Sequence, residues 1–335
     1  MQIIKSNKQT LNNMASNNCS PERRSIMDGS KININHEAAR LGYFGQSNDS
    51  LNDYIKQLII NKHGDQVSEL KNDIHRFDGI IAGTEKYDSH LLNGAENLKV
   101  ISRVGVGLDN IDLDYASEKG IKVFKTQTSP AIAVAELALG LILDLMRKII
   151  EQSNNLNKGV WKKQMGSLVS GKTLGIIGLG TIGKKLVEIT KGFQLKYLAY
   201  DLIKDEVFAK ENNVEYWDLS YLLDNADIIS VHLNMTKENE NLINMSKLKK
   251  MKPSSIIINT SRGEIINEHD LEIAVKNGVI AGAGLDVFQE EPYNGPLTNY
   301  ENVILSPHIG SYAQEIRMAM ELEAVNNLIE GLNTK

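Results

Sequence analysis

The sequence predicts an α/β fold with a mainly parallel sheet, and three observations support this prediction. Short apolar runs of strand length alternate with longer segments of helical character along most of the chain, which is typical of parallel strands joined by helices. These runs are apolar throughout, so helices must cover both faces of the sheet. The chain has 335 residues, 41% hydrophobic and 24% charged, which suits a sizeable core and most naturally two domains.

The beginning of the chain carries the weakest structural signals. Residues 1 to 38 are rich in Asn, Ser and Lys and show neither helical nor strand periodicity, so we expect a flexible tail. Beyond it, the pattern predicts a helix over 51–61 and strands over 79–82, 99–104 and 121–125.

A long apolar helix is predicted over 131–150. Ser129 and Pro130 precede it, and proline is favoured at the first position of a helix. The stretch is not expected to span a membrane, because charged residues interrupt it and would be costly at the centre of a bilayer. These residues are Glu136, Asp144, Arg147 and Lys148.

A second series of strands and helices follows, and no repeat of fixed spacing interrupts it. The alternation again predicts a parallel sheet with helices on both faces. The predicted elements are strands over 173–177, 197–200, 228–231, 255–259, 283–286 and 303–306, a helix from Ile182, and a last helix over 311–332 that can pack back onto the first domain.

Composition excludes several functional classes. The formal net charge of −5 leaves no large basic surface for nucleic acid. Cys19 is the single cysteine, so no intramolecular disulfide can form and a reducing cytoplasm is the expected compartment. The first thirty or so residues lack the apolar run of a signal peptide. We therefore expect a cytoplasmic protein without nucleic-acid, membrane or metal partners.

A glycine-rich turn follows the strand predicted over 173–177. Its glycines permit a tight turn and close approach of a pyrophosphate, which the free N–H groups of the following helix attract. Asp201 ends the next strand, where a carboxylate can bind the adenosine ribose hydroxyls and repel a 2′-phosphate, so we expect NAD rather than NADP. The expected cofactor contacts in this region are Gly178, Gly180, Thr181, Ile182, Gly183 and Asp201.

Several short sequence segments lie in a characteristic order between about residues 78 and 320. They are Ile81-Ala-Gly-Thr84, Ile101 to Asp112, Lys172 to Gly183, Ile258 to Gly263, Gly284 to Pro292, and Ser306-Pro-His-Ile-Gly310. Together these runs resemble the D-isomer-specific 2-hydroxyacid dehydrogenase family, and within it the phosphoglycerate dehydrogenases. One departure is His232-Leu-Asn, where the family often has His-x-Pro.

The resemblance implies two Rossmann-like or flavodoxin-like α/β domains, with the nucleotide-binding domain inserted into a discontinuous substrate domain. It also implies a homodimer, and we expect no C-terminal regulatory domain of the kind found in some phosphoglycerate dehydrogenases. The expected boundaries are a tail at 1–38, a substrate domain at 39–126 and 309–335, and an NAD-binding domain at 127–308.

Three residues meet the chemical needs of 2-keto acid reduction, which are a cation for the carboxylate and a proton donor for the carbonyl oxygen beside the nicotinamide. Arg262 follows a predicted strand at the sheet edge where ligands bind, and its planar fork can hold a carboxylate bidentately. His308 is the expected acid and base. By resemblance, Glu291 pairs with His308, holds one ring tautomer and favours the protonated ring.

The substrate side is expected to lie around the first resembling runs. Backbone N–H groups of Val104, Gly105 and Val106 are expected to hold the substrate carboxylate, because glycine allows close approach. Arg103 aligns with an arginine that faces the substrate phosphate in phosphoglycerate dehydrogenases, and Asn110 is expected to shape the same loop. Arg262 and His308 are expected to contact both substrate and cofactor. The other expected contacts near the nicotinamide are His232, Thr260 and Asp286, the last of which either tunes this region or caps its strand.

The sequence leaves several functions open. One is oxidation of D-3-phosphoglycerate to 3-phosphohydroxypyruvate, which Arg103 favours. Another is reduction of glyoxylate, hydroxypyruvate or another small 2-keto acid, including a phosphonate analogue. A different class is an NAD-sensing interaction module similar to the C-terminal-binding-protein corepressors, which can keep the same Arg, Glu and His. Formate or phosphite oxidation on the same fold is the least favoured.

Overall fold

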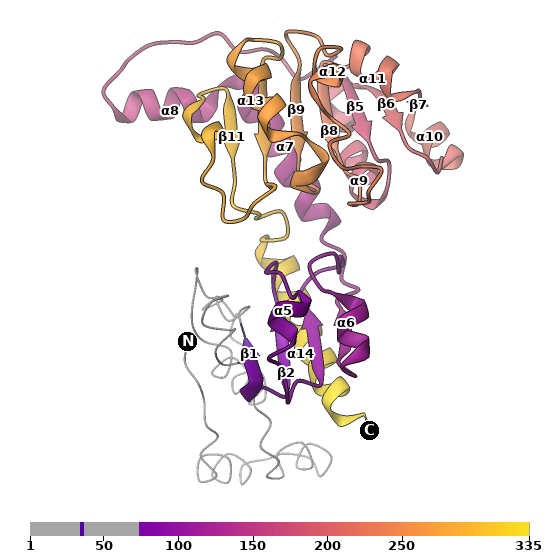
Figure 1. Cartoon of the computed structure of the whole chain (residues 1–335). Helices are drawn as coiled ribbons and strands as arrows, with labels where there is room; N and C mark the ends of the chain where they lie inside the picture. The colour runs from indigo at the N-terminus through magenta and orange to yellow at the C-terminus, as the bar shows by residue number, and fades with distance from the viewer. Residues whose placement is uncertain (1–33, 37–73, 335) are drawn as a thin grey trace, which may run out of the picture. The chain divides into compact units, whose positions relative to one another are not determined.

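The computed structural model describes residues 34–36 and 74–334, and the chain divides into two compact units (Figure 1). The first unit comprises Met1–Ser129 and Gln314–Lys335, and the second comprises Pro130–Ala313. The second unit is therefore inserted into the sequence of the first. The domain boundaries expected from the sequence, after residue 126 and before residue 309, stay predictions.

The first unit contains a four-stranded parallel sheet in the order β1-β2-β3-β4. Its inner strands are apolar, and their alternating side chains form two cores. Ile80 and Ile101 face helices α5 and α6, whereas Ile81 and Val100 face helix α14. The elements are β1 (Ile34–His36), 3-10 helix η2 (Ile74–Arg76), β2 (Gly79–Ala82), α5 (Ser89–Leu92), β3 (Val100–Arg103), α6 (Leu113–Glu118), β4 (Lys122–Lys125) and α14 (Gln314–Asn333).

Polar contacts fix the last helix, α14, to the rest of the first unit. The buried Ser102 hydroxyl on β3 donates to the carbonyl oxygen of Ala324 at 2.7 Å. Glu323 accepts from the backbone N–H groups of Gln127 at 2.7 Å and Thr128 at 2.9 Å. The helix therefore holds both the sheet and the segment by which the chain leaves this unit.

The second unit contains a seven-stranded sheet in the order β11-β10-β9-β8-β5-β6-β7, with every pair parallel. The chain moves outward from β5 to β6 and β7, then returns to β8 on the other side of β5. The carboxyl ends of β5 and β8 thus form the switch point at which open α/β sheets bind ligands. The strands are β5 (Thr173–Ile177), β6 (Lys196–Tyr200), β7 (Val214–Tyr216), β8 (Ile228–Val231), β9 (Ile256–Asn259), β10 (Gly282–Leu285) and β11 (Val303–Leu305).

Helices cover both faces of this sheet, because successive strand residues alternate between two cores. Ile228 belongs to a core with α7 and α9, whereas Ile229 belongs to a core with α11 and α13. The helices are α7 (Ala131–Arg147), α8 (Ile149–Asn157), α9 (Thr181–Thr190), α10 (Glu206–Asn212), α11 (Leu219–Asn225), α12 (Met245–Leu248) and α13 (Glu268–Lys276), with 3-10 helices η3 (Lys191–Phe193), η4 (Gly263–Ile265) and η5 (Pro296–Asn299).

The predicted α/β class and parallel sheets are confirmed, with corrections in detail. The helix expected over 131–150 ends at Arg147, because Lys148 is left-handed at φ 54° and the Asp144 carboxylate accepts the N–H of Ile150 at 2.7 Å. Pro130 is the N-cap of α7 rather than its first helical residue. Strands β1 and β7 were not predicted, and the helix predicted over 51–61 lies outside the described residues.

Between residues 74 and 334 no helix is both long and apolar enough to cross a bilayer. In the same range, no group of His, Cys, Asp and Glu side chains is placed to hold a metal ion.

The carboxyl of Glu321 is buried inside the first unit. Glu321 on α14 is 3% exposed, and its Oε1 lies 2.5 Å from Nε of Arg317, one turn earlier. Its Oε2 is buried without a hydrogen-bond partner among the described residues. Burial raises the pKa of Glu321 to about 7, although the positive charge of Arg317 opposes the change.

The stability of the first unit is expected to fall as pH rises from about 5 to 7. In this window the unfolded chain has released the Glu321 proton, whereas the folded chain retains it, so each step up in pH favours unfolding. A pKa displacement of this size corresponds to roughly 3 kcal/mol. Urea unfolding at several pH values should therefore show a flatter profile for Glu321→Gln. The exposed Glu330→Gln is the control, and parallel profiles for all three proteins would contradict the assignment.

Candidate active site

The glycine-rich turn joins β5 to α9 at the switch point of the second unit. Gly178 has a φ of +96°, and a Cβ there would lie 2.6 Å from the carbonyl oxygen of His232. A Cβ at Gly183 would lie 2.5 Å from the carbonyl oxygen of Gly178. The first glycine thus permits the turn, and the third permits close packing of helix and strand.

Gly180 differs from the other two glycines. A Cβ at this position would meet nothing within 4 Å in the described part of the chain, so internal packing does not explain the glycine. Gly180 is also the N-cap of α9, and no side chain caps the N–H groups at this helix end, where Thr181 and Ile182 lie. Open space beside uncapped N–H groups fits a pyrophosphate.

Asp201 lies beside the glycine turn, directly after β6. Its Oδ2 accepts from the N–H of Leu179 at 2.8 Å, and its Oδ1 accepts from the N–H of Ile203 at 3.0 Å. A carboxylate oxygen can accept more than one hydrogen bond, so both oxygens keep capacity for ribose hydroxyls. The same side chain therefore supports the turn and is available to the adenosine ribose.

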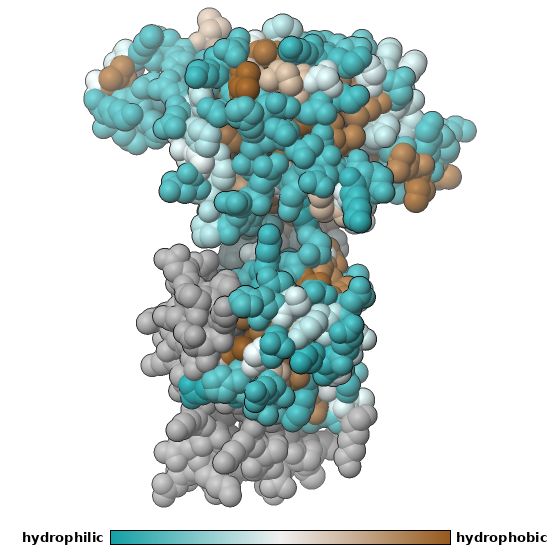
Figure 2. Space-filling view, viewed as in Figure 1, coloured by the Kyte–Doolittle hydropathy of each residue, from teal (hydrophilic) through white to brown (hydrophobic). Residues whose placement is uncertain are grey.

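Apolar side chains are exposed next to Asp201. Leu202 and Ile203 are 86% and 85% exposed, and Val207 on α10 is also exposed. Figure 2 shows hydrophobic side chains gathered around α10 on a surface that is otherwise mainly hydrophilic. An adenine ring is a suitable partner for such a surface, because burying its faces removes apolar area from water.

His232 and Thr260 follow β8 and β9. Each has a buried polar atom that lacks a hydrogen-bond partner among the described residues, Nδ1 in His232 and Oγ1 in Thr260. Buried polar atoms are nearly always bonded in folded proteins. Together with the open space at Gly180, these atoms show that this sheet edge fits a dinucleotide.

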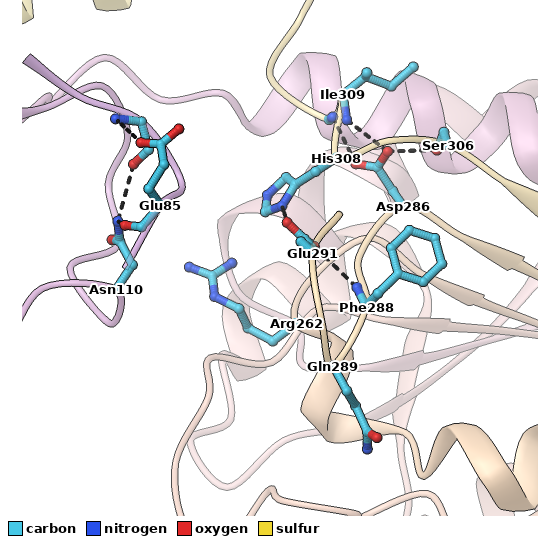
Figure 3. A network of polar contacts seen from close by, with 12 residues as sticks. Glu85, Asn110, Arg262, Asp286, Phe288, Gln289, Glu291, Ser306, His308 and Ile309 are labelled. Atoms are coloured by element: carbon cyan, nitrogen blue, oxygen red, sulfur yellow. Dashed lines mark hydrogen bonds and ion pairs between the residues drawn. The ribbon is translucent and has the colours of Figure 1, made fainter. Parts of the chain in front are cut away.

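The loop that carries His308 is held by the buried carboxylate of Asp286. This carboxylate accepts from the Ser306 hydroxyl at 2.6 Å, the Ile309 N–H at 2.8 Å and the Gly310 N–H at 2.8 Å (Figure 3). Burial raises the pKa of Asp286, while these hydrogen bonds and His308 act in the opposite direction. His308 itself has a φ of +52°, a conformation that costs on the order of 1 to 3 kcal/mol and needs surrounding support.

Glu291 orients the ring of His308. Its Oε2 lies 2.8 Å from His308 Nδ1, and its Oε1 accepts from the N–H of Phe288 at 3.1 Å. Both side chains are partly exposed, at 31% for the histidine and 29% for the glutamate. Because Nδ1 faces the carboxylate, Nε2 is the ring atom available to exchange a proton with a ligand.

Arg262 lies on the turn that follows β9. The Asn259 amide donates to the Arg262 carbonyl oxygen at 2.8 Å and so shapes this turn, while Arg262 Nη1 donates to the Ser261 carbonyl oxygen at 2.7 Å. Figure 3 shows the Arg262 and His308 side chains extending on the same side of this sheet edge. A guanidinium and a histidine–carboxylate pair thus share one edge of the second unit.

A backbone contact joins the arginine turn to the glutamate loop. A Cβ at Gly263 would lie 2.0 Å from the carbonyl carbon of Phe288 and 2.5 Å from the nitrogen of Gln289. Only glycine allows these two backbones to touch. The spacing between Arg262 and the Glu291 loop is therefore set by the main chain.

Two of the three N–H groups that were expected to hold the substrate carboxylate donate inside the first unit. The N–H of Val104 donates to the Ala82 carbonyl oxygen at 2.9 Å, and that of Gly105 donates to Thr126 Oγ1 at 3.0 Å. Both are therefore engaged inside the unit, and Thr126 is too distant in sequence to signal this. For Val106, the described part of the chain provides no acceptor, and its side chain is exposed.

Arg103 and Asn110 also lie on this side of the first unit. Arg103 folds back over Gly105, where a Cβ would lie 1.0 Å from its Nη1, and Nη1 donates to the Val104 carbonyl oxygen at 2.8 Å. The Asn110 amide donates to the carbonyl oxygens of Gly83 at 3.1 Å and Glu85 at 2.7 Å (Figure 3). Asn110 thus shapes the loop as expected, whereas Arg103 braces its own backbone.

The second unit therefore has the features of a dinucleotide-dependent dehydrogenase. A glycine turn with an acidic residue after the next strand recognises a dinucleotide, and a histidine with an orienting carboxylate provides a proton donor. Both features lie at the carboxyl edge of one parallel sheet.

Comparison with known proteins defines the family. Residues 139–310 match the family model described as "D-isomer specific 2-hydroxyacid dehydrogenase, NAD binding domain". The chain is 43% identical over 256 residues to a glyoxylate reductase of Thermococcus litoralis, covering 73% of this chain and 77% of that protein. It is 38% identical over 299 residues to a hydroxypyruvate reductase of Thermotoga maritima, covering 85% and 97%.

Further relatives agree with this result. A D-3-phosphoglycerate dehydrogenase of Archaeoglobus fulgidus is 36% identical over 279 residues, which cover 81% of this chain and 53% of that protein. The crystal structure of a glyoxylate reductase from Paecilomyes thermophila has a TM-score of 0.71 and 29% identity, covering 84% of this chain and 91% of that one. The chain belongs to the D-isomer-specific 2-hydroxyacid dehydrogenase family. It is an NAD-dependent oxidoreductase that acts on the CH–OH group of 2-hydroxy acids.

Replacing Asp201 by asparagine is expected to weaken the preference for NADH over NADPH by about tenfold or more, because the charge that repels a 2′-phosphate is removed. Asparagine retains one oxygen for the backbone N–H groups, whereas Asp201→Ala loses both acceptors and should also weaken binding of both cofactors. Fluorescence titration with each cofactor measures these effects, with exposed Asp224→Asn as control. An unchanged NADH to NADPH ratio would move ribose recognition to another residue.

Proposed function

We propose that this protein reduces a small 2-keto acid, of the glyoxylate and hydroxypyruvate class, to its D-2-hydroxy acid with NADH. The observation that carries this proposal is the shared edge of Arg262 and the His308–Glu291 pair beside the glycine turn. The names of the Thermococcus litoralis and Thermotoga maritima relatives support this substrate class. In this assignment the second unit binds NAD and the first provides the substrate domain.

His308, Glu291 and Arg262 each have a defined role in the proposed reaction. Bound NADH supplies a hydride to C2 of the keto acid. His308 donates the proton on Nε2 to the carbonyl oxygen, and Glu291 stabilises the positively charged ring through Nδ1. Arg262 holds the substrate carboxylate with its planar fork, which also polarises the neighbouring carbonyl. In the reverse direction, neutral His308 accepts the hydroxyl proton.

On the substrate side, the backbone around Val106 is the proposed partner of the carboxylate. The Val104 and Gly105 N–H groups already donate inside the unit, so the N–H of Val106 is the member of the expected set that can bind an anion. We therefore keep this loop as the proposed carboxylate site, with the N–H of Val106, rather than those of Val104 and Gly105, as the binding group.

A phosphorylated substrate is the second candidate. The Archaeoglobus fulgidus relative, named as a D-3-phosphoglycerate dehydrogenase, favours it. The position of Arg103 weighs against it, because this guanidinium lies over Gly105 and donates to the Val104 carbonyl oxygen. We therefore rank D-3-phosphoglycerate, first in the sequence-based expectations, below the small keto acids.

We also propose that the protein is a homodimer of the cytoplasm. Apolar side chains are exposed on α8 and the segment after it, among them Ile149, Leu156, Trp161 and Met165. An exposed apolar set of this kind is typical of a protein interface, and a second copy of the chain is its proposed partner. The cytoplasm is favoured because the single cysteine gives no disulfide framework.

The substrate class is tested by NADH oxidation with glyoxylate, hydroxypyruvate, pyruvate and 3-phosphohydroxypyruvate. We expect the highest kcat/KM with glyoxylate or hydroxypyruvate, and His308→Ala should lower kcat by roughly 10²- to 10⁴-fold because the general acid is lost. The exposed His269→Ala is the matched control. Preference for the phosphorylated acid would reverse the ranking, and NADH binding without turnover of any acid would favour an NAD-sensing module.

Arg262→Lys is expected to lower kcat/KM at least tenfold for every accepted acid, because an ammonium group cannot reproduce the two-pronged contact with a carboxylate. NADH affinity, measured separately by fluorescence, should change much less. Steady-state kinetics over a range of acid concentrations provides the comparison. Equal kcat/KM for variant and wild type would remove Arg262 from the substrate site.

A further inference from the structure

Glu85, in the loop that follows β2, folds its side chain back over its own backbone. Its Oε2 accepts from the N–H of Gly83 at 3.2 Å. A Cβ at Gly83 would lie 3.0 and 3.1 Å from the two carboxylate oxygens, so the carboxylate lies over the carboxyl end of β2. The reaction described above gives this carboxylate no role.

Asn110 connects the Glu85 loop to the segment that carries Val106. Its side-chain amide donates to the carbonyl oxygens of Gly83 at 3.1 Å and Glu85 at 2.7 Å (Figure 3), and its own carbonyl oxygen accepts from the N–H of Tyr87 at 2.8 Å. Strands β2 and β3 are parallel neighbours, so the loops after them leave the same edge of the sheet. The Glu85 carboxylate and the N–H of Val106, the proposed partner of the substrate carboxylate, thus belong to two loops that are fixed to each other.

One oxygen of Glu85 has capacity for a ligand. The side chain is only partly buried. Its Oε2 is occupied by the N–H of Gly83, and among the residues that the structure describes no donor is placed on Oε1. A carboxylate accepts hydrogen bonds and cannot donate them. Glu85 therefore favours a ligand group that donates, such as a hydroxyl, and disfavours a second anion.

The opposite charge of Arg103 lies over a different strand end. Its Nη1 covers Gly105 and donates to the Val104 carbonyl oxygen at 2.8 Å, after β3, whereas the Glu85 carboxylate covers Gly83, after β2. The N–H of Gly105 also donates to Thr126, on the β4 side of β3. A ligand group over the end of β2 therefore meets the carboxylate first.

The proposed reaction leaves one part of the substrate for Glu85. Arg262 and the N–H of Val106 are the proposed partners of the C1 carboxylate, and His308 is the proposed partner of the C2 oxygen. Glu85 would repel the C1 carboxylate, so the remaining substituent at C3 is the group that suits it.

We propose that Glu85 determines substrate specificity: its carboxylate accepts a hydrogen bond from a hydroxyl on C3 of the keto acid and disfavours acids with a phosphate or a second carboxylate there. This proposal rests on the function proposed above and narrows it to 3-hydroxy-2-keto acids, of which hydroxypyruvate is the simplest. A hydroxyl supplies the donor that a carboxylate needs. A phosphate brings a like charge, which is unfavourable beside Glu85.

NADH oxidation by the purified full chain, with acids that differ only at C3, tests the proposal. Pyruvate lacks the C3 hydroxyl, hydroxypyruvate has it, and 3-phosphohydroxypyruvate carries a phosphate on it. Glu85→Gln keeps the side-chain shape and one oxygen for the N–H of Gly83, but its other terminal group is a donor. We expect the kcat/KM ratio of hydroxypyruvate to pyruvate to fall about tenfold, the loss typical of one hydrogen bond at a partly exposed site. The ratio of the phosphorylated acid to pyruvate should rise by about the same factor.

Ionic strength provides a second readout. Salt screens the interaction between exposed charges, so the advantage of Glu85→Gln over the wild type with 3-phosphohydroxypyruvate should shrink as salt is added. A mere change in loop shape would give no such dependence. The exposed Glu96→Gln is the matched control, and both of its ratios should equal those of the wild type.

The contrary outcomes separate this proposal from the proposed function. Wild-type ratios in Glu85→Gln, or an equal fall in kcat/KM for every acid, would overturn the role of Glu85 and leave the reduction of small keto acids intact. An advantage with the phosphorylated acid that persists at high salt would overturn the repulsion. Failure of the wild type to reduce any of these acids would overturn the proposed function as well.

Discussion

The position of the loop that carries His308 depends on one buried carboxylate, that of Asp286. It accepts three hydrogen bonds from the loop after β11, and this loop holds His308 in a left-handed conformation. Removing a carboxylate from water is costly, and the three donors offset that cost. The sequence left open whether Asp286 tunes the nicotinamide region or caps its strand. Its contacts show a clamp that bridges two neighbouring strand ends and positions the histidine for Glu291.

The shape of the glycine-rich turn between β5 and α9 depends on the main chain more than on side chains. Gly178 and Gly183 are required by contacts inside the protein, whereas Gly180 leaves open space. Asp201 then connects this turn to the next strand through the N–H of Leu179. The features that suit a dinucleotide are thus built into the strand–turn–helix unit.

The sequence predicted the strands well because their burial leaves continuous apolar runs, as at 173–177 and 228–231. It was weaker for the short helices α10 to α13, although each begins after an aspartate or asparagine whose side chain accepts a backbone N–H. Local signals could have found these caps. By contrast, the bond between Thr126 and Gly105 and the folding of Arg103 over Gly105 depend on tertiary packing, so no short motif reveals them.

The bare backbone contact between Gly263 and residues 288 and 289 has a consequence for how such enzymes diversify. Because this contact is made by main-chain atoms, the turn bearing Arg262 and the loop bearing Glu291 are coupled without any specific side chain. Neighbouring side chains can therefore differ in size and polarity while this main-chain contact keeps the spacing between the Arg262 turn and the Glu291 loop.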